Sequence, residues 1–265
     1  SGFSLDTLSN LREPALLLNQ KEIIFLHQNK KNLSAYPYLE LDEAAQKIRI
    51  LPSAPRQTFL FINPSGSIWK LQLSDNSLVE LNADSRICFP SAVHLMPRQL
   101  ELSGEAFFTV SASPKNPFTV KMKDIRVTAT GTAFNINTHS TDSTIRTSVF
   151  EGKIKIYNNT DSISLSQGME FIATSSKLLS GQFNAQQITA WRNHQFYFKD
   201  TPVREVLEQI SHWYGLQIVY NRPVDFHLNA LVPFSTPLPD LLLLLEKTGH
   251  AQFALRGDTL IVDPS

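Results

Sequence analysis

Apolar and polar residues alternate with a period of two along most of the chain up to about residue 190. Between Arg98 and Ile156 the alternation consists largely of β-branched and aromatic residues, and single glycines interrupt it at Gly104, Gly131 and Gly152. This period is typical of half-buried β-strands. A glycine inside such a pattern indicates a bulge or a close approach of two backbones. We therefore expect this stretch to form the middle of a long antiparallel sheet.

Shorter patterns on either side of this stretch predict hairpins. The apolar runs 16–18 and 23–26 flank Asn19-Gln20, and this arrangement favours two strands joined by a tight turn. The segment 163–171 has the same character and is expected to turn at Gly168.

Periodicity is lost between residues 178 and 190, where amides and a glycine replace the alternation, and we expect a domain boundary there. The predicted organisation is an N-terminal hairpin region (1–54) that packs on a β domain (55–185), followed by a small C-terminal domain (190–265).

The period changes after Trp191. Residues 191–198 are predicted to form a strand, with Thr201 as the N-cap of a helix and Pro202 at its first position. Apolar residues then recur at helical spacing up to Trp213, and Gly215 suits the left-handed residue that ends a helix.

The remaining residues predict strands over 216–220 and 226–234, a second helix closed by Gly249, and a C-terminal hairpin. The order β-α-β-β-α-β-β is typical of a small α/β sandwich with both helices on one face of a sheet. Five consecutive leucines, 241–245, place apolar side chains all round the second helix. That helix is either buried on two sides or in contact with a partner.

Composition excludes several function classes. The 265 residues include 24 basic and 24 acidic side chains, so the formal net charge is zero, and no stretch combines basic and aromatic residues as a nucleic-acid site would. Cys88 is the only cysteine, which rules out an intrachain disulfide, and its strand-like context predicts burial. No run of about 18 apolar residues is present. Ser1-Gly2 is interpreted as the remnant of a removed tag on a piece of a longer protein.

No pattern of catalytic or metal-binding residues is found. The seven histidines lack the spacing of metal ligands, and no nucleotide-binding or hydrolase motif occurs. Glu105 and Glu151, each beside a glycine, are expected to bond to backbone or to pair with Arg98 or Arg126. We therefore expect no conventional enzyme, no metal and no cofactor.

Five sequence blocks nevertheless follow one another in the order of a known family: LQLSDNSLVELNADSRICFP, RQLELSGEAFFTV, NPFTV, TGTAFNI and TSVFEGKIKI. They resemble the extracytoplasmic part of FecR-family anti-sigma factors over about residues 55–255, and the segment 191–218 resembles the C-terminal domain of the Bacteroidetes branch. The chain departs from the family pattern at Asn76, His194 and Asn116. Asparagine also adopts the left-handed conformation of the glycine usual at position 76, so that turn is expected to survive.

The resemblance implies a mainly β fold: a large antiparallel β-sandwich or β-solenoid-like FecR domain, then a small α/β domain resembling the secretin/TonB short N-terminal domain. It also implies a periplasmic sensor that receives a signal from the signalling domain of a TonB-dependent outer-membrane transporter. Such a protein controls an ECF sigma factor through a cytoplasmic segment, and its membrane span and sigma-binding helices are expected upstream of Ser1.

The C-terminal domain is the expected contact surface for that transporter. Pairing along the edge of strand 191–198 or 216–220 is an ordinary way for two such domains to dock. The predicted partner-binding residues are Trp191, Phe196, Phe198, Trp213 and Tyr214. For Trp213, a place in the core of its own domain is the alternative.

One bond is a candidate for self-cleavage. Some members of this family are cleaved at a Gly-Thr bond of the block that Gly131 and Thr132 match, by attack of the threonine hydroxyl on the preceding carbonyl. The alternative is a bulge in which Thr132 forms a hydrogen bond.

Two further functions remain open on sequence grounds. The β domain is a candidate binding module for a glycan or peptide at the cell envelope, for which Trp69 and Phe107 are the only aromatic pair to point to. Both residues also fit a core position. A scaffold role in a larger envelope assembly is the third interpretation.

Overall fold

A computed structural model describes residues 11–19, 21–26, 33–140, 144–158, 161–173 and 178–265. The chain forms two compact units, Ser1–Phe183 and Asn184–Ser265. The turn residue Gln20 of the predicted N-terminal hairpin lies outside the described residues.

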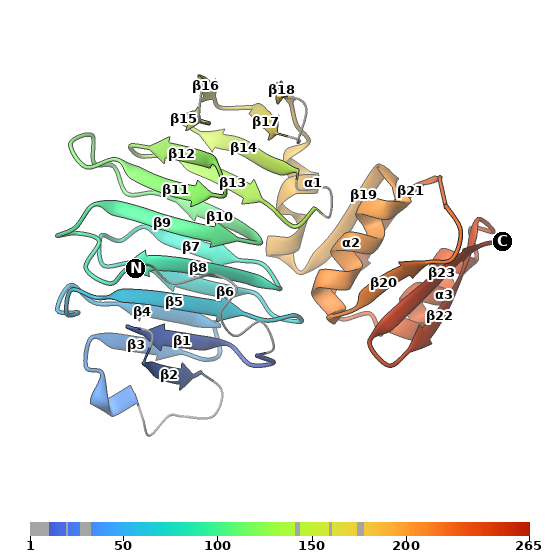
Figure 1. Ribbon diagram of the computed structural model, residues 1–265, viewed down its shortest axis with the longest axis horizontal. Coiled ribbons are helices and arrows are strands. Elements are labelled where there is room, and N and C mark those ends of the chain that lie inside the picture. The colour runs from blue at the N-terminus through green and yellow to red at the C-terminus, as the bar shows by residue number, and fades with distance from the viewer. Residues whose placement is uncertain (1–10, 20, 27–32, 141–143, 159–160, 174–177) are drawn as a thin grey trace. The chain divides into compact units, whose positions relative to one another are not determined.

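The first unit consists of two nine-stranded sheets, here called sheet A and sheet B (Figure 1). In spatial order, sheet A contains β16 (Ser162–Ser166), β15 (Lys153–Tyr157), β12 (Ile125–Ala129), β11 (Phe118–Met122), β9 (Arg98–Ser103), β8 (Ser85–Pro90), β5 (Thr58–Asn63), β1 (Ala15–Leu18) and β2 (Glu22–Phe25). Sheet B contains β18 (Leu178–Gln182), β17 (Met169–Ala173), β14 (Ile145–Glu151), β13 (Ala133–Asn137), β10 (Glu105–Thr109), β7 (Leu78–Leu81), β6 (Trp69–Gln72), β4 (Lys47–Ile50) and β3 (Leu39–Asp42). A single 3₁₀ turn, η1 (Leu33–Ala35), precedes β3.

The two sheets share one apolar core. Alternate residues of strands from both sheets form a continuous buried cluster, in which Phe108 of sheet B lies 6.0 Å from Phe118 of sheet A, measured between ring centroids. Trp69 is fully buried in this cluster. The mainly β fold predicted from the alternation is therefore confirmed, and so is the burial of Cys88, which is 9% exposed.

The prediction of one long antiparallel sheet between Arg98 and Ile156 was wrong. The chain crosses from one sheet to the other several times in this stretch, and β9 pairs with β11 in parallel. The predicted hairpin over 163–171 is also absent, since β16 belongs to sheet A and β17 to sheet B. The N-terminal hairpin of β1 and β2 is confirmed.

Glycines stand at the corners where the chain changes sheets. Gly104 separates β9 from β10, Gly131 separates β12 from β13, Gly152 separates β14 from β15, and Gly168 separates β16 from β17. All four have positive φ, at 105°, 147°, 76° and 82°. An alternating pattern specifies the two faces of a strand but not its neighbours. It therefore predicted the strands and not the sheet to which each belongs.

The second unit contains α1 (Ala185–Thr189), η2 (Ala190–Asn193), β19 (Gln195–Pro202), α2 (Val203–Tyr214), β20 (Gln217–Tyr220), β21 (His227–Pro233), α3 (Leu238–Glu246), β22 (Ala251–Arg256) and β23 (Thr259–Pro264). From β19 onward the predicted order β-α-β-β-α-β-β is confirmed. The strands form two small sheets and not one: β19 pairs with β21 in sheet C, and β20, β23 and β22 form sheet D in that spatial order.

Two local predictions in this unit need correction. Residues 191–193 belong to a 3₁₀ helix, and β19 continues through Thr201 to Pro202. Pro202 is therefore the N-cap of α2, while the Thr201 hydroxyl oxygen accepts a hydrogen bond from the Lys199 N–H at 3.0 Å. The predicted end of the helix is confirmed, because Gly215 has φ 70° and its N–H donates to the Ser211 carbonyl.

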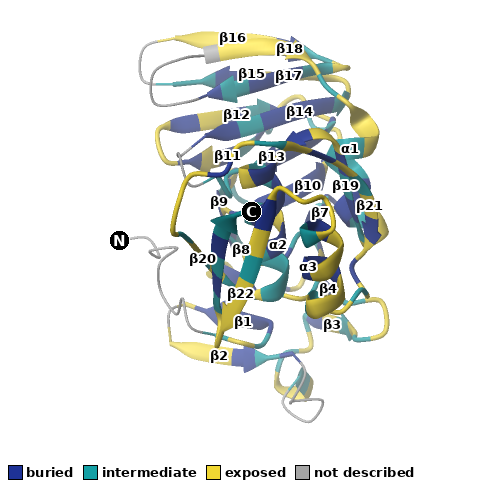
Figure 2. Ribbon diagram, turned by 90° about the vertical axis from the view of Figure 1, so that its right-hand side faces the viewer, coloured by how far each residue is buried: buried dark blue, intermediate teal, exposed yellow. Residues whose placement is uncertain are grey.

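The leucine-rich helix α3 is buried on one side only (Figure 2). Leu241, Leu242 and Leu245 are buried, whereas Leu243 and Leu244 are 53% and 51% exposed. Among the described residues, no helix is long and apolar enough to cross a membrane.

The glycine corners generate a first prediction. A Cβ at Gly104 would lie 2.7 Å from the Ser85 Cα, whereas a Cβ at Gly168 would have no neighbour within 4 Å, and both residues have positive φ. Gly168→Ala therefore introduces backbone strain alone and is expected to cost about 1 kcal/mol of unfolding free energy. Gly104→Ala adds a clash with backbone and is expected to cost more than about 3 kcal/mol. Chemical denaturation measures both, and equal losses would contradict the assignment of Gly104 to a close approach.

Candidate functional site

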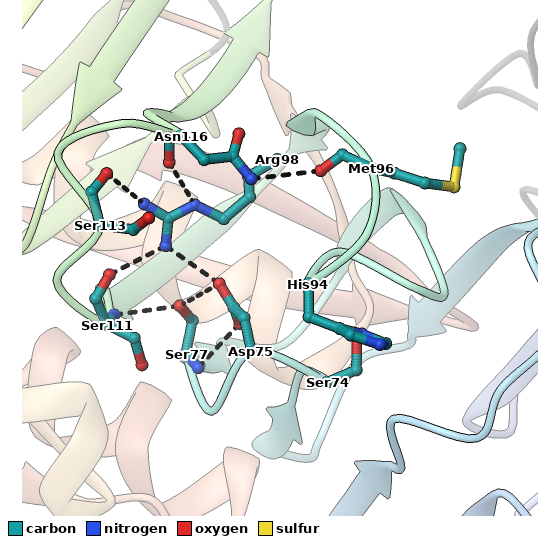
Figure 3. A network of polar contacts seen from close by, with 9 residues as sticks. All are labelled: Ser74, Asp75, Ser77, His94, Met96, Arg98, Ser111, Ser113 and Asn116. Atoms are coloured by element: carbon teal, nitrogen blue, oxygen red, sulfur yellow. Dashed lines mark hydrogen bonds and ion pairs between the residues drawn. The ribbon is translucent and has the colours of Figure 1, made fainter.

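A buried arginine lies at the centre of a polar network in the first unit (Figure 3). Arg98 on β9 is 2% exposed, and its Nη1 forms an ion pair with the Asp75 Oδ2 at 3.0 Å. Its Nε donates to the Asn116 carbonyl at 2.7 Å, and Nη1 also donates to the Ser111 carbonyl at 2.8 Å. The guanidinium carbon lies 5.6 Å from the ring centroid of Phe118. A guanidinium has five donors in a planar fork, so it can serve a carboxylate and several carbonyls at once.

The carboxylate of this ion pair is itself held by a turn. Asp75 accepts hydrogen bonds from the Ser77 N–H and the Ser77 hydroxyl, both at 2.9 Å. The Ser77 hydroxyl oxygen accepts from the Ser111 N–H at 3.1 Å. Asn76 has φ 67°, so the turn keeps the left-handed residue despite the departure from the family pattern.

Glu105 belongs to a second polar cluster. Its carboxylate accepts hydrogen bonds from the amide nitrogens of Asn82 at 2.9 Å and Asn135 at 3.0 Å. The expectation that Arg98 would pair with Glu105 or Glu151 is replaced by the ion pair with Asp75. In the contacts that the structure describes, these polar residues of the family-like blocks fix loops and strands.

The Gly131-Thr132 corner has unusual geometry. A Cβ at Gly131 would lie 3.0 Å from the Cα and Cβ of Ala112, and one at Gly152 would lie 2.8 Å from the Thr132 Cγ2. The Thr132 hydroxyl is buried and forms no hydrogen bond with any residue that the structure describes. The alternative drawn from the sequence is therefore met in part: the pairing of β13 with β14 shifts register between Ala133 and Phe134, as at a bulge, but the Thr132 hydroxyl lacks the expected hydrogen bond.

Four of the predicted partner-binding residues, Phe196, Phe198, Trp213 and Tyr214, gather in one aromatic cluster, in which Phe198 stacks on Phe196 with 5.9 Å between ring centroids. Phe234 on the C-terminal side of β21, which sequence reasoning missed, lies 3.9 Å from Trp213 and 4.5 Å from Phe196 between ring centroids. Tyr214 stacks on Phe196, and its hydroxyl donates to the Thr236 carbonyl. The apolar alternation of 226–234 was the only signal for Phe234, and it indicated a core residue.

The five predicted partner-binding residues differ in how far their side chains are exposed to solvent. Trp191, Phe196 and Phe198 are buried, and Trp213 and Tyr214 are half-buried. Burial raises the pKa of the Tyr214 hydroxyl above its usual value. Their role in partner binding stays a prediction.

Sheet D has an open edge at β20. The N–H groups of Gln217 and Asn221 donate to the carbonyls of Asp258 and Val262, on the side of β23. Since backbone groups alternate along a strand, the N–H groups of Ile218 and Tyr220 point to the open edge. Val219 between them is 46% exposed.

The aromatic pair considered for a glycan site does not form one. Trp69 is fully buried in the core. Phe107 is 5% exposed and packs on Phe150 with 5.1 Å between ring centroids.

The arginine network generates a second prediction. Arg98→Ala leaves a carboxylate that is only 11% exposed and several carbonyls without the guanidinium donor, so we expect a loss of about 3–5 kcal/mol in unfolding free energy. Arg98→Lys is not expected to restore stability, because an ammonium cannot reproduce the fork. The exposed pair Arg49–Glu40, at 3.2 Å, provides the control, and Arg49→Ala should cost less than about 1 kcal/mol. Similar losses in Arg98→Ala and Arg49→Ala would refute the central role of Arg98.

Comparison with known proteins identifies the family. Residues 62–155 match the family model described as FecR protein, and residues 195–262 match the model described as FecR, C-terminal. Together the two matches cover more than half of the chain. No curated protein matches it in sequence.

Solved structures agree on the fold. Two crystal structures of a putative anti-sigma factor from Parabacteroides distasonis, at 1.65 Å and 2.50 Å resolution, each superpose with a TM-score of 0.70. They are 23% and 22% identical to the chain, and each match covers 78% of this chain and 99% of the other. With two family models matched in order along the sequence, the chain belongs to the FecR family of anti-sigma factors.

Proposed function

We propose that the chain is the sensor part of a transmembrane anti-sigma factor. In this proposal it lies in the periplasm and receives a signal from the signalling domain of a TonB-dependent outer-membrane transporter. It then controls an ECF sigma factor through a cytoplasmic segment. Membership of the FecR family supports the role in sigma regulation.

The open edge of β20 is the observation that supports the transporter contact. A partner strand that pairs with β20 would satisfy the N–H groups that point away from β23. The edge strand, Gln-Ile-Val-Tyr, carries no charge and no proline, the features with which natural proteins block such pairing. Exposed Val219 provides apolar surface at the same edge.

This contact generates a third prediction. Val219→Glu places a charge in the proposed interface and is expected to weaken binding to the transporter's signalling domain by roughly tenfold or more. Leu95→Glu is the matched control, because Leu95 is 56% exposed and belongs to the first unit. Isothermal titration calorimetry of the full chain measures both variants. Unchanged affinity in Val219→Glu would remove β20 from the interface.

The Gly131-Thr132 corner supports a second activity, self-cleavage. We propose that the Thr132 hydroxyl oxygen attacks the Gly131 carbonyl carbon, which transfers the acyl group from nitrogen to oxygen. The hydroxyl proton passes to the released α-amino group, and an ester joins the two halves. Water then hydrolyses the ester into a Gly131 carboxylate and a free Thr132 hydroxyl. The backbone conformation of Gly131 and the unsatisfied Thr132 hydroxyl favour this reaction, because each raises the energy of the intact bond.

The fourth prediction tests this reaction. Denaturing mass spectrometry of aged protein should show two fragments, 1–131 and 132–265, and hydroxylamine should convert the ester to a hydroxamate on Gly131. Thr132→Ser keeps the hydroxyl and should still cleave, whereas Thr132→Ala should stay whole. A single species at 29.8 kDa in the wild type would contradict self-cleavage.

A further inference from the structure

A groove lies over the outer face of sheet A, on the side of the sheet away from the core. Its volume is about 710 Å³, and its lining comes from β5, β8, β9, β11, β12 and β15. Directly opposite residues follow one another across these strands in the order Tyr157, Arg126, Lys121, Glu101 and Cys88. The groove therefore runs across the strands and has a charged and a neutral end.

Two cations without a counter-ion among the described residues lie at the charged end: Arg126 lines the groove, and Lys155 lies beside it on β15, directly opposite the lining residue Thr128. The Arg126 guanidinium carbon lies 5.7 Å from the ring centroid of Tyr157, and the Lys155 Nζ lies 5.0 Å from the same centroid. Within the described part of the chain neither forms an ion pair, and both are exposed. Lys121 and Glu101 pair with each other at 3.7 Å. The positive charge that remains at this end is complementary to an anion.

The groove also restricts how a ligand can be recognised. All six strands are interior strands of sheet A, whose edges are β16 and β2, so each has a neighbouring strand on both sides, although β8 and β9 pair only through Arg86–Cys88 and Glu101–Ser103. A peptide that binds by strand pairing needs a free edge, and this face offers none. The groups available are side-chain hydroxyls and an amide, from Thr58, Thr119, Thr128 and Gln99. Half-buried Met96 and exposed Pro97 add apolar surface at the neutral end.

We propose that this groove binds an acidic oligosaccharide. A carboxylate of the sugar lies between Arg126 and Lys155, and sugar hydroxyls exchange hydrogen bonds with Thr119, Thr128 and Gln99. Charge-assisted bonds to the guanidinium and the ammonium supply most of the affinity. The site involves neither β20 nor Thr132, so it is independent of the signalling contact and of self-cleavage. It gives the sensor a point of attachment to anionic glycan.

Calorimetric titration of the full chain with trigalacturonate tests this site. The double variant Arg126→Gln/Lys155→Gln should lose affinity by about tenfold or more. Lys70→Gln, at an exposed lysine on β6 of sheet B, should leave affinity unchanged. Raising the salt concentration should weaken binding to the wild type. Circular dichroism confirms that each variant is folded, which is expected because all three side chains are exposed.

Two further probes distinguish the ligand classes. Maltotriose, a neutral trisaccharide, should bind much more weakly than trigalacturonate, and hexaglutamate should not compete with it. Tighter binding of hexaglutamate would overturn the proposal in favour of an acidic peptide. The absence of trigalacturonate binding, or equal binding by the wild type and the double variant, would also overturn it.

Discussion

The buried guanidinium of Arg98 satisfies backbone carbonyls that the parallel pairing of β9 and β11 leaves inside the protein. Parallel neighbours cannot be joined by a tight turn, and the chain between them runs through β10 in the opposite sheet and returns by a loop. Carbonyls of that loop, at Ser111 and Asn116, have to be satisfied inside the protein. Arg98 donates to both, and its charge is balanced by Asp75. One side chain thus joins a strand, a turn and a return loop.

Glycines allow the sharp turns by which the chain passes from one sheet to the other. Gly104, Gly131 and Gly152 each turn the chain from one sheet to the other with positive φ, and a Cβ at any of them would meet a neighbour at 3.0 Å or less. The candidate for cleavage lies at one of these corners. A corner needs a conformation that other residues avoid, and a buried hydroxyl needs a partner. The corner conformation that the fold requires and the buried hydroxyl that could attack the Gly131 carbonyl therefore occur together at Gly131-Thr132.

Features that depend on residues close together in the sequence were predicted correctly, and features that depend on distant residues were not. Strand positions, the β1–β2 hairpin and the end of α2 at Gly215 depend on neighbouring residues, and they were predictable. The sheet to which β17 belongs, and the pairing of β9 with β11, depend on contacts between distant segments, which a period of two does not encode. The groove could not be predicted from the sequence either, because Arg126, Lys155 and Gln99 come from three separate strands that only the fold brings together. The candidate for self-cleavage at Thr132 came from the resemblance to the family, whose motif the contiguous pair Gly131-Thr132 matches.

Buried polar residues of the family-like blocks hold the fold, whereas the proposed groove uses side chains of the outer sheet face, from within the blocks (Gln99, Thr119 and Lys155) and from outside them (Arg126). Asp75, Arg98 and Glu105 lie in the blocks, and each is occupied in holding the fold. Arg126 and Val219 lie outside them, with exposed side chains at a sheet face and at a sheet edge. The buried residues of the blocks therefore identify the scaffold, and specificity for a ligand or partner resides in exposed positions. A relative with the same blocks and other residues at these two positions would keep the fold and bind something else.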